Sequence, residues 1–132
     1  MDVPQPKKKI VFIGGGGGVR NIAPALKDEY DFTAIISTFD NGGSYGRLRG
    51  PYHSPLTGDV RAALAVLSTN KLAELSEYRF ERGDISGHAL GNLVLTAVHA
   101  MHEQPEQAME HLHELYAVQG KVLPVSFTYA DV

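Results

Sequence analysis

Residues 10–18 read IVFIGGGGG, a run of four apolar residues followed directly by five glycines. A short apolar run that ends in glycine is typical of a strand buried on both faces of a parallel sheet. Because glycine has no Cβ, backbone amides at such a turn can approach phosphate oxygens closely where a helix begins. The stretch therefore predicts a strand, a phosphate-binding turn and a helix. The candidate phosphate-binding residues are Gly14, Gly15, Gly16, Gly17 and Gly18.

Two common nucleotide-binding motifs do not fit this turn. If Gly14 and Gly16 are the first two glycines of a dinucleotide fingerprint, Val19 stands where the third belongs. No lysine occupies the position that a P-loop requires. Ordinary NAD binding and P-loop hydrolysis are therefore disfavoured. A flexible glycine linker is disfavoured too, because linkers rarely interrupt so sharp a strand-to-helix transition.

The next residues predict a parallel crossover. Asn21 can cap a helix that runs to about Lys27, with Pro24 in its first turn, and residues 32–38 form a second β-rich run. A strand, a helix and a strand in this order indicate a right-handed connection between parallel strands. The expected class is α/β, a Rossmann-like three-layer fold with a parallel sheet.

Helices dominate the rest of the chain. Asp59 is expected as the N-cap of a helix, and helical spacing returns in residues 90–101 and 109–116, where Gly120 ends the last helix. Residues 121–127 read as a third strand.

Three strands are few for a parallel sheet, which ordinarily has five or six. We therefore interpret residues 8–132 as the front part of a nucleotide-binding domain, truncated or completed by a partner, and residues 1–7 as a loose tail. The uncovered third strand favours a homo-oligomer.

Residues 39–58 hold too many glycines and prolines for regular structure, and compact domains keep loops of this length mainly for function. The segment follows the second strand, at the carboxyl edge where open α/β sheets bind ligands. Asp40 and Asp59 are candidate Mg²⁺ ligands, and the Arg47 guanidinium can bind phosphate oxygens. A polar turn is the simpler alternative for this segment, and capping alone explains Asp59 equally well. The segment's other candidate nucleotide-binding residues are Asn41, Gly42, Gly43 and Ser44.

A second candidate group lies at the start of the third helix. If the helix begins near Ser86, His88 and Asn92 are four residues apart and share a face near its amino end. Gly91 inside a helix is unfavourable by about 1 kcal/mol relative to alanine, which indicates close backbone packing or ligand approach. Ordinary helix packing is an equally good explanation of this group.

The composition excludes several classes of protein. A net charge of −3 offers no basic field for nucleic acid, and Lys7, Lys8 and Lys9 form the only basic run. The chain has no cysteine for disulfides or thiolate zinc sites, and no apolar stretch of signal-peptide or membrane-span length. We expect a cytoplasmic protein that binds neither nucleic acid nor membrane.

Six spaced motifs resemble those of one family, the CofD-like proteins, which comprise 2-phospho-L-lactate transferase and the bacterial gluconeogenesis factor. The resemblance covers nearly the whole chain from Lys8 onward. The motifs are GGGGGVR (14–20), FDNGGSYGRLR (39–49), LTGDVRAAL (56–64), YRF (78–80), SGHALGNL (86–93) and VQGKVLP (118–124).

The resemblance implies a Rossmann-like fold that binds a nucleotide diphosphate conjugate. In the transferase branch, Asp40 and Asp59 match the metal-associated aspartates of an enzyme of coenzyme F420 biosynthesis, which transfers a phospholactyl group with Mg²⁺. In the gluconeogenesis-factor branch, the same nucleotide site is associated with UDP-sugars. The protein of this branch affects carbon metabolism and cell shape, without an established catalytic turnover. The YRF and GHALGN motifs are more similar to this second branch, which would place His88 and Asn92 at the nucleotide site. A degenerate fragment that binds nothing is the third alternative.

Overall fold

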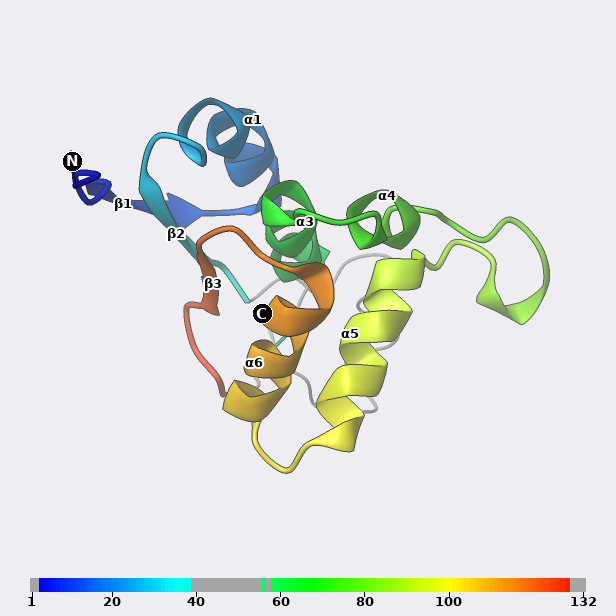
Figure 1. The fold of residues 1–132 in the computed structure, drawn as a ribbon. Helices are drawn as coiled ribbons and strands as arrows, with labels where there is room; N and C mark the ends of the chain where they lie inside the picture. Colours follow the sequence, from blue (N-terminus) through cyan, green and yellow to red (C-terminus); the bar gives the residue numbers. More distant parts are fainter. Residues whose placement is uncertain (1–2, 39–55, 57, 129–132) are drawn as a thin grey trace.

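The fold opens on parallel strands joined by a helix, as the sequence predicts. In this computed structural model, strand β1 (Lys9–Gly14) leads into helix α1 (Gly16–Leu26) and strand β2 (Asp31–Ile36). Strand β3 (Lys121–Pro124) pairs with β2, so the sheet has the order β1-β2-β3 with both pairings parallel (Figure 1). The α/β class is therefore confirmed. The structure describes residues 3–38, 56 and 58–128.

Helices fill the chain between β2 and β3. Figure 1 shows α3 and α4 to the right of the strands and α5 and α6 lower in the view, with α3 between α1 and α5. In the described part of the chain, no helix is long and apolar enough to cross a membrane. These helices are α3 (Gly58–Leu67), α4 (Leu72–Ser76), α5 (Leu90–Met101) and α6 (Pro105–Tyr116), with a short 3-10 helix, η1, at Gly83–Ile85.

The core lies on one face of the sheet. Phe32, Ala34 and Ile36 of β2 point into it, since alternate residues of a strand face the same side. The helical side chains that pack there are mostly aliphatic, and burial of each stabilises the fold by roughly 1.5–3 kcal/mol. The fully buried ones include Val19, Val60, Leu64, Leu67, Leu95, Leu112 and Tyr116.

The opposite face corrects the expectation that β1 is buried on both sides. Val11 is 58 % exposed and Ile13 is 74 % exposed. A continuous apolar run shows that both faces of a strand can be buried, but whether the second face is covered depends on other elements. In this structure β1 is an edge strand whose outward residues remain exposed.

The first helix begins six residues earlier than expected. It starts at Gly16 rather than behind Asn21, and Pro24 lies far inside it rather than in its first turn. Glycine is a poor helix former, so propensity argues against a start at Gly16. Packing overrides propensity here, because Val19 and Ala23 lie four residues apart and are both buried.

The ends of the last elements also differ from expectation. Helix α6 ends at Tyr116, where Ala117 takes a left-handed conformation with φ 48°, whereas Gly120 lies in the turn before β3 with φ 101°. β2 and β3 end at Ile36 and Pro124, earlier than predicted.

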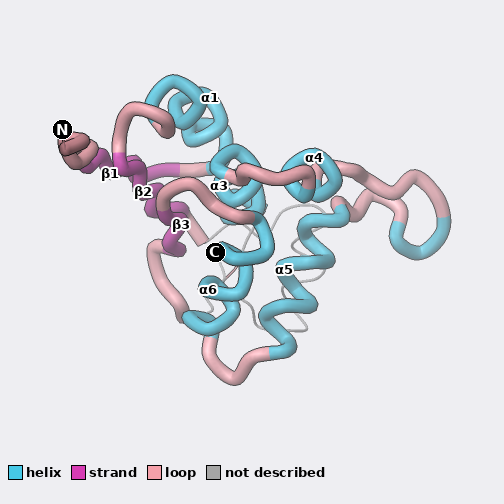
Figure 2. Tube along the Cα trace, in the orientation of Figure 1, coloured by secondary structure: helices cyan, strands magenta, loops and turns pink. Residues whose placement is uncertain are grey.

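Sequence periodicity did not reveal the segment that links α4 to α5. Figure 2 shows residues 77–89 projecting from the body of the protein as an arm that contains η1. Its two sides pair near the base, where the Phe80 amide donates to the His88 carbonyl at 3.0 Å and the Leu90 amide donates to the Tyr78 carbonyl at 2.8 Å. The arm therefore leaves and rejoins the body at one place.

Candidate functional site

The five glycines form the end of a strand and the first turn of a helix. Gly14 ends β1, Gly15 is the N-cap of α1, and α1 begins with three glycines at residues 16–18. Gly15 has no side chain to cap the helix, and the first turn holds no acidic residue. The first amides of a helix lack partners within it, so this turn presents backbone donors. Gly17 and Gly18 are exposed to solvent.

Neighbouring side chains explain most of these glycines. A Cβ at Gly14 or Gly18 would lie 2.8 or 2.9 Å from the Phe12 ring. A Cβ at Gly16 would lie 2.8 Å from Asp59 Oδ1 and 3.2 Å from Asp59 Cα. At Gly17 a Cβ would meet nothing within 4 Å, and its backbone is not left-handed. Packing therefore gives no reason for glycine at position 17.

Asp59 faces the glycine turn from the first turn of α3. The structure corrects the expected N-cap role, because α3 begins at Gly58 and Asp59 lies within it. Its carboxylate oxygens would lie 3.4 Å from a Cβ at Gly15, the N-cap of α1, and 2.8 Å from a Cβ at Gly16. The amino end of a helix carries partial positive charge, which favours a carboxylate there.

Asp59 is the described member of the predicted metal pair. Asp40 lies outside the described residues, as do Asn41, Gly42, Gly43, Ser44 and Arg47. Within the described ranges, no group of three His, Cys, Asp or Glu side chains could hold a metal ion. The shared Mg²⁺ site of Asp40 and Asp59 therefore stays a prediction.

The amino end of α5 packs on the other side of α3. A Cβ at Gly91 would lie 2.7 Å from Arg61 Cδ and 2.9 Å from Ser76 Cβ. This confirms the close backbone packing that glycine inside a helix indicated. The first turn of α3 thus contacts the first turns of both α1 and α5.

His88 and Asn92 do not share a helix face, contrary to expectation. Helix α5 starts at Leu90, so Asn92 lies in its first turn whereas His88 belongs to the arm. The glycine at position 87 has φ 85°, which favours a turn where the sequence pattern suggested helix. Both side chains are buried, His88 to 8 % exposure and Asn92 to 2 %.

Sequence reasoning missed a buried charge next to this site. Arg61 is 6 % exposed, and its Nη1 lies 2.9 Å from Glu77 Oε2. The same oxygen accepts a hydrogen bond from Arg20 Nη2 of α1 at 2.8 Å. The available signal was an arginine within the apolar sequence VRAAL, which suggests burial on a helix face. Because charged residues are rarely buried unless paired, such an arginine also predicts an acidic partner.

Tyr116 of α6 lies close to this ion pair. Its hydroxyl is fully buried, and burial raises the pKa of Tyr116 above the ordinary value of 10.0, while the Ser76 hydroxyl and the Arg61 charge oppose that rise. Tyr116 is therefore a neutral neighbour of Arg61 at physiological pH.

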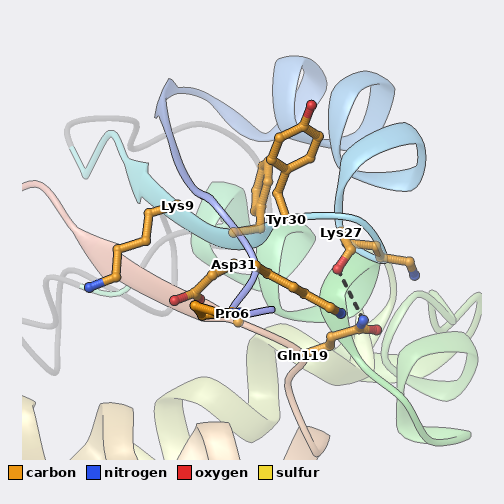
Figure 3. Close-up of a pocket in the computed structure, with 9 residues that line it drawn as sticks. Pro6, Lys9, Lys27, Tyr30, Asp31 and Gln119 are labelled. Atoms are coloured by element: carbon orange, nitrogen blue, oxygen red, sulfur yellow. Dashed lines mark hydrogen bonds between the residues drawn. The ribbon is translucent and has the colours of Figure 1, made fainter. Parts of the chain in front are cut away.

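A separate pocket lies at the opposite end of the sheet, where the strands begin. Figure 3 shows Lys9 and Lys27 there with Tyr30, Asp31 and Gln119. Gln119 Nε2 donates to the Lys27 carbonyl at 3.0 Å, and Lys27 Nζ donates to the Val66 carbonyl at 3.1 Å. The Gln119 hydrogen bond therefore links the turn before β3 to the turn after α1, away from the glycine turn.

Comparison with known proteins agrees with the motifs. The family described as 2-phospho-L-lactate transferase CofD matches residues 10–132. The gluconeogenesis factor of Bacillus subtilis is 40 % identical over 124 residues, covering 91 % of this chain and 39 % of its own. That of Halalkalibacterium halodurans is also 40 % identical over 124 residues, covering 91 % of this chain and 38 % of its own.

The solved structures agree on the fold. A crystal structure of a Bacillus halodurans protein superimposes with a TM-score of 0.85 at 39 % identity, covering 92 % of this chain and 41 % of that protein. The chain thus spans about two fifths of the length of these relatives. On the match over residues 10–132, the chain belongs to the CofD family.

Proposed function

We propose that the chain binds a nucleotide diphosphate conjugate, such as a UDP-sugar, with its diphosphate at the first turn of α1. The observation that carries this proposal is Gly17, which faces open space. Glycine destabilises a helix interior by about 1 kcal/mol relative to alanine, and no neighbour of Gly17 requires it. A bare amide at the amino end of a helix is what a phosphate oxygen needs for close approach.

Asp59 adds a reason to expect a cation. Its carboxylate lies beside the same turn, where it would repel a diphosphate. A carboxylate oxygen together with phosphate oxygens is a donor set that suits Mg²⁺, so the residues fit this ion. Mg²⁺ would supply charge neutralisation between Asp59 and the phosphates, with Asp40 as its second predicted ligand.

The biological role that we propose is that of a cytoplasmic regulator of the gluconeogenesis-factor type, affecting carbon metabolism and cell shape. Relatives from Bacillus subtilis and Halalkalibacterium halodurans carry the name gluconeogenesis factor, which supports the part of this role that concerns carbon metabolism. The second candidate is a Mg²⁺-dependent transferase of phosphorus-containing groups, of the 2-phospho-L-lactate transferase type, which the family description supports. Asp59 beside the glycines suits either role.

A thermal-shift titration tests the proposal. UDP-N-acetylglucosamine, UDP-glucose, GDP and NAD are each added with and without Mg²⁺, and a ligand of the folded state raises the melting temperature progressively with its concentration. UDP-sugars should stabilise most if the regulator role holds, and GDP should stabilise most if the transferase role holds. No shift with any of them would contradict nucleotide binding by this chain and favour a non-binding fragment.

We expect Asp59→Asn to abolish the Mg²⁺ dependence of nucleotide binding. The amide keeps the shape of the carboxylate but has no charge to offer a cation. With Mg²⁺ present, affinity should fall by about tenfold or more, which corresponds to about 1.4 kcal/mol of lost cation-mediated interaction. Calorimetric titration at several Mg²⁺ concentrations measures this change.

Asp84→Asn is the matched control. Asp84 is an exposed aspartate in the first turn of η1, within the arm. Its replacement should leave both the affinity and the Mg²⁺ dependence unchanged. If nucleotide binding by Asp59→Asn still depends on Mg²⁺ as strongly as in the parent, Asp59 is not a metal ligand.

A further inference from the structure

Glu77 connects the two helices that form the candidate site. It follows the last residue of α4, and its Oε2 lies 2.8 Å from Arg20 Nη2 of α1 and 2.9 Å from Arg61 Nη1 of α3. One carboxylate oxygen therefore bridges α1 and α3. These are the helices whose first turns bring Gly16 and Asp59 together.

The α3 side of this bridge is buried. The Arg61 side chain is 8 % exposed, and its stem is held against the backbone of α5 at Gly91. A buried guanidinium that loses its carboxylate partner is strongly unfavourable. The buried Arg61 charge therefore holds the Glu77 carboxylate near it through an ion pair.

The α1 side of the bridge lies close to the glycine turn. Arg20 is four residues after Gly16, and residues four apart lie on the same side of a helix. Exposed ion pairs contribute little to stability, and the Arg20 and Glu77 side chains are 46 % and 39 % exposed. This pair therefore contributes mainly to the orientation of α1 relative to α3. The two helices are in contact nearby at Gly16, which has no side chain.

We propose that Glu77 is a positioning residue, which through Arg61 and Arg20 sets the first turn of α1 against Asp59. Glu77 does not touch the glycines itself. Its carboxylate links α3 to α1 through the two arginines, and so places the exposed residues Gly17 and Gly18 relative to the Asp59 carboxylate. This inference rests on the proposed function for its consequence in binding, but its structural content can be tested without ligand.

The test compares Glu77→Gln, Arg20→Gln and the parent chain by NMR in the absence of ligand. The reporters are the amide resonances of residues 16–18 and the exchange rate of the Val19 amide, which donates to the Gly15 carbonyl at 3.2 Å and closes the first turn of α1. In Arg20→Gln, where the Arg61–Glu77 pair is kept, exchange at Val19 should accelerate by about threefold, the size of a lost exposed ion pair. In Glu77→Gln the acceleration should be about tenfold, because Arg61 also loses its partner.

Glu74→Gln is the matched control, because Glu74 is an exposed glutamate of α4, the helix that Glu77 follows. It should leave the glycine resonances and the Val19 exchange rate as in the parent. Unchanged resonances and exchange in both Glu77→Gln and Arg20→Gln would overturn the positioning role, even if melting temperatures fell. Should Glu77→Gln fail to fold, Arg20→Gln decides the matter alone.

The same variants separate this inference from the proposed function. If the parent binds a UDP-sugar, the positioning role predicts a higher Mg²⁺ concentration for half-saturation in both variants, with no change in Glu74→Gln. If the parent binds none of the nucleotides, the proposed function fails while the NMR comparison still decides the role of Glu77.

Discussion

Gly16→Val should destabilise the protein by about 3 kcal/mol and abolish nucleotide binding with it. The new Cβ would lie 2.8 Å from Asp59 Oδ1, 3.1 Å from Ala62 Cβ and 3.2 Å from Asp59 Cα. The Asp59 Cα belongs to the backbone of α3, so the clash cannot be relieved by a side-chain rotation alone. Helix α1 must move away from α3, which separates the glycine turn from Asp59. Urea unfolding measures the loss of stability.

A side chain at Gly16 would point at α3, because its Cβ would contact Asp59 and Ala62 of that helix. Gly17→Ala is the matched control, because a Cβ at Gly17 meets nothing within 4 Å. Alanine there should leave stability unchanged or raise it by up to about 1 kcal/mol. A Gly16→Val protein as stable as Gly17→Ala would show that α1 and α3 are not in the contact described.

Gly120→Ala should destabilise the fold by about 3 kcal/mol or more. Gly120 has φ 101°, a backbone conformation that residues other than glycine rarely adopt. A Cβ at this position would collide with the carbonyl oxygen of Phe32. That carbonyl belongs to β2, the middle strand of the sheet. The turn into β3 would therefore have to open, which weakens the pairing of β3 with β2. Thermal and urea unfolding measure the effect.

Gly83→Ala separates the two sources of this loss. Gly83 also has a positive φ, 72°, but a Cβ there would meet nothing within 4 Å. Its replacement introduces backbone strain alone, and should lower the free energy of unfolding by about 1 kcal/mol. Equal effects at Gly83 and Gly120 would contradict the close approach of Gly120 to β2.

The elements with a strong local pattern were predictable from the sequence. The apolar run before the glycines identified β1, and the spacing of Leu90, Leu93 and Val94 identified α5. Gly91 was informative in a different way. A residue of low helix propensity inside a helix indicates a close neighbour, and in the structure Arg61 packs against Gly91.

Features that depend on distant residues were not predictable. Arg20 and Glu77 are 57 positions apart, and no periodicity relates them. Helix α4 has five residues, too few for a repeating pattern, and its place depends on packing against α3 and α5. The start of α1 was misjudged for the same reason, because burial of Val19 and Ala23 outweighs the low helix propensity of three glycines.

The charge of a side chain at Gly17 tests the phosphate site most directly. Gly17→Asp and Gly17→Asn have nearly the same shape, and both fit the open space at this position. Aspartate should be the more stable variant by about 0.3–1 kcal/mol, because an anion is favoured at the amino end of a helix. We expect it nevertheless to bind UDP-N-acetylglucosamine at least about tenfold more weakly than Gly17→Asn in calorimetric titration, because its charge repels the diphosphate. Equal affinities in the two variants would contradict a diphosphate site at the first turn of α1.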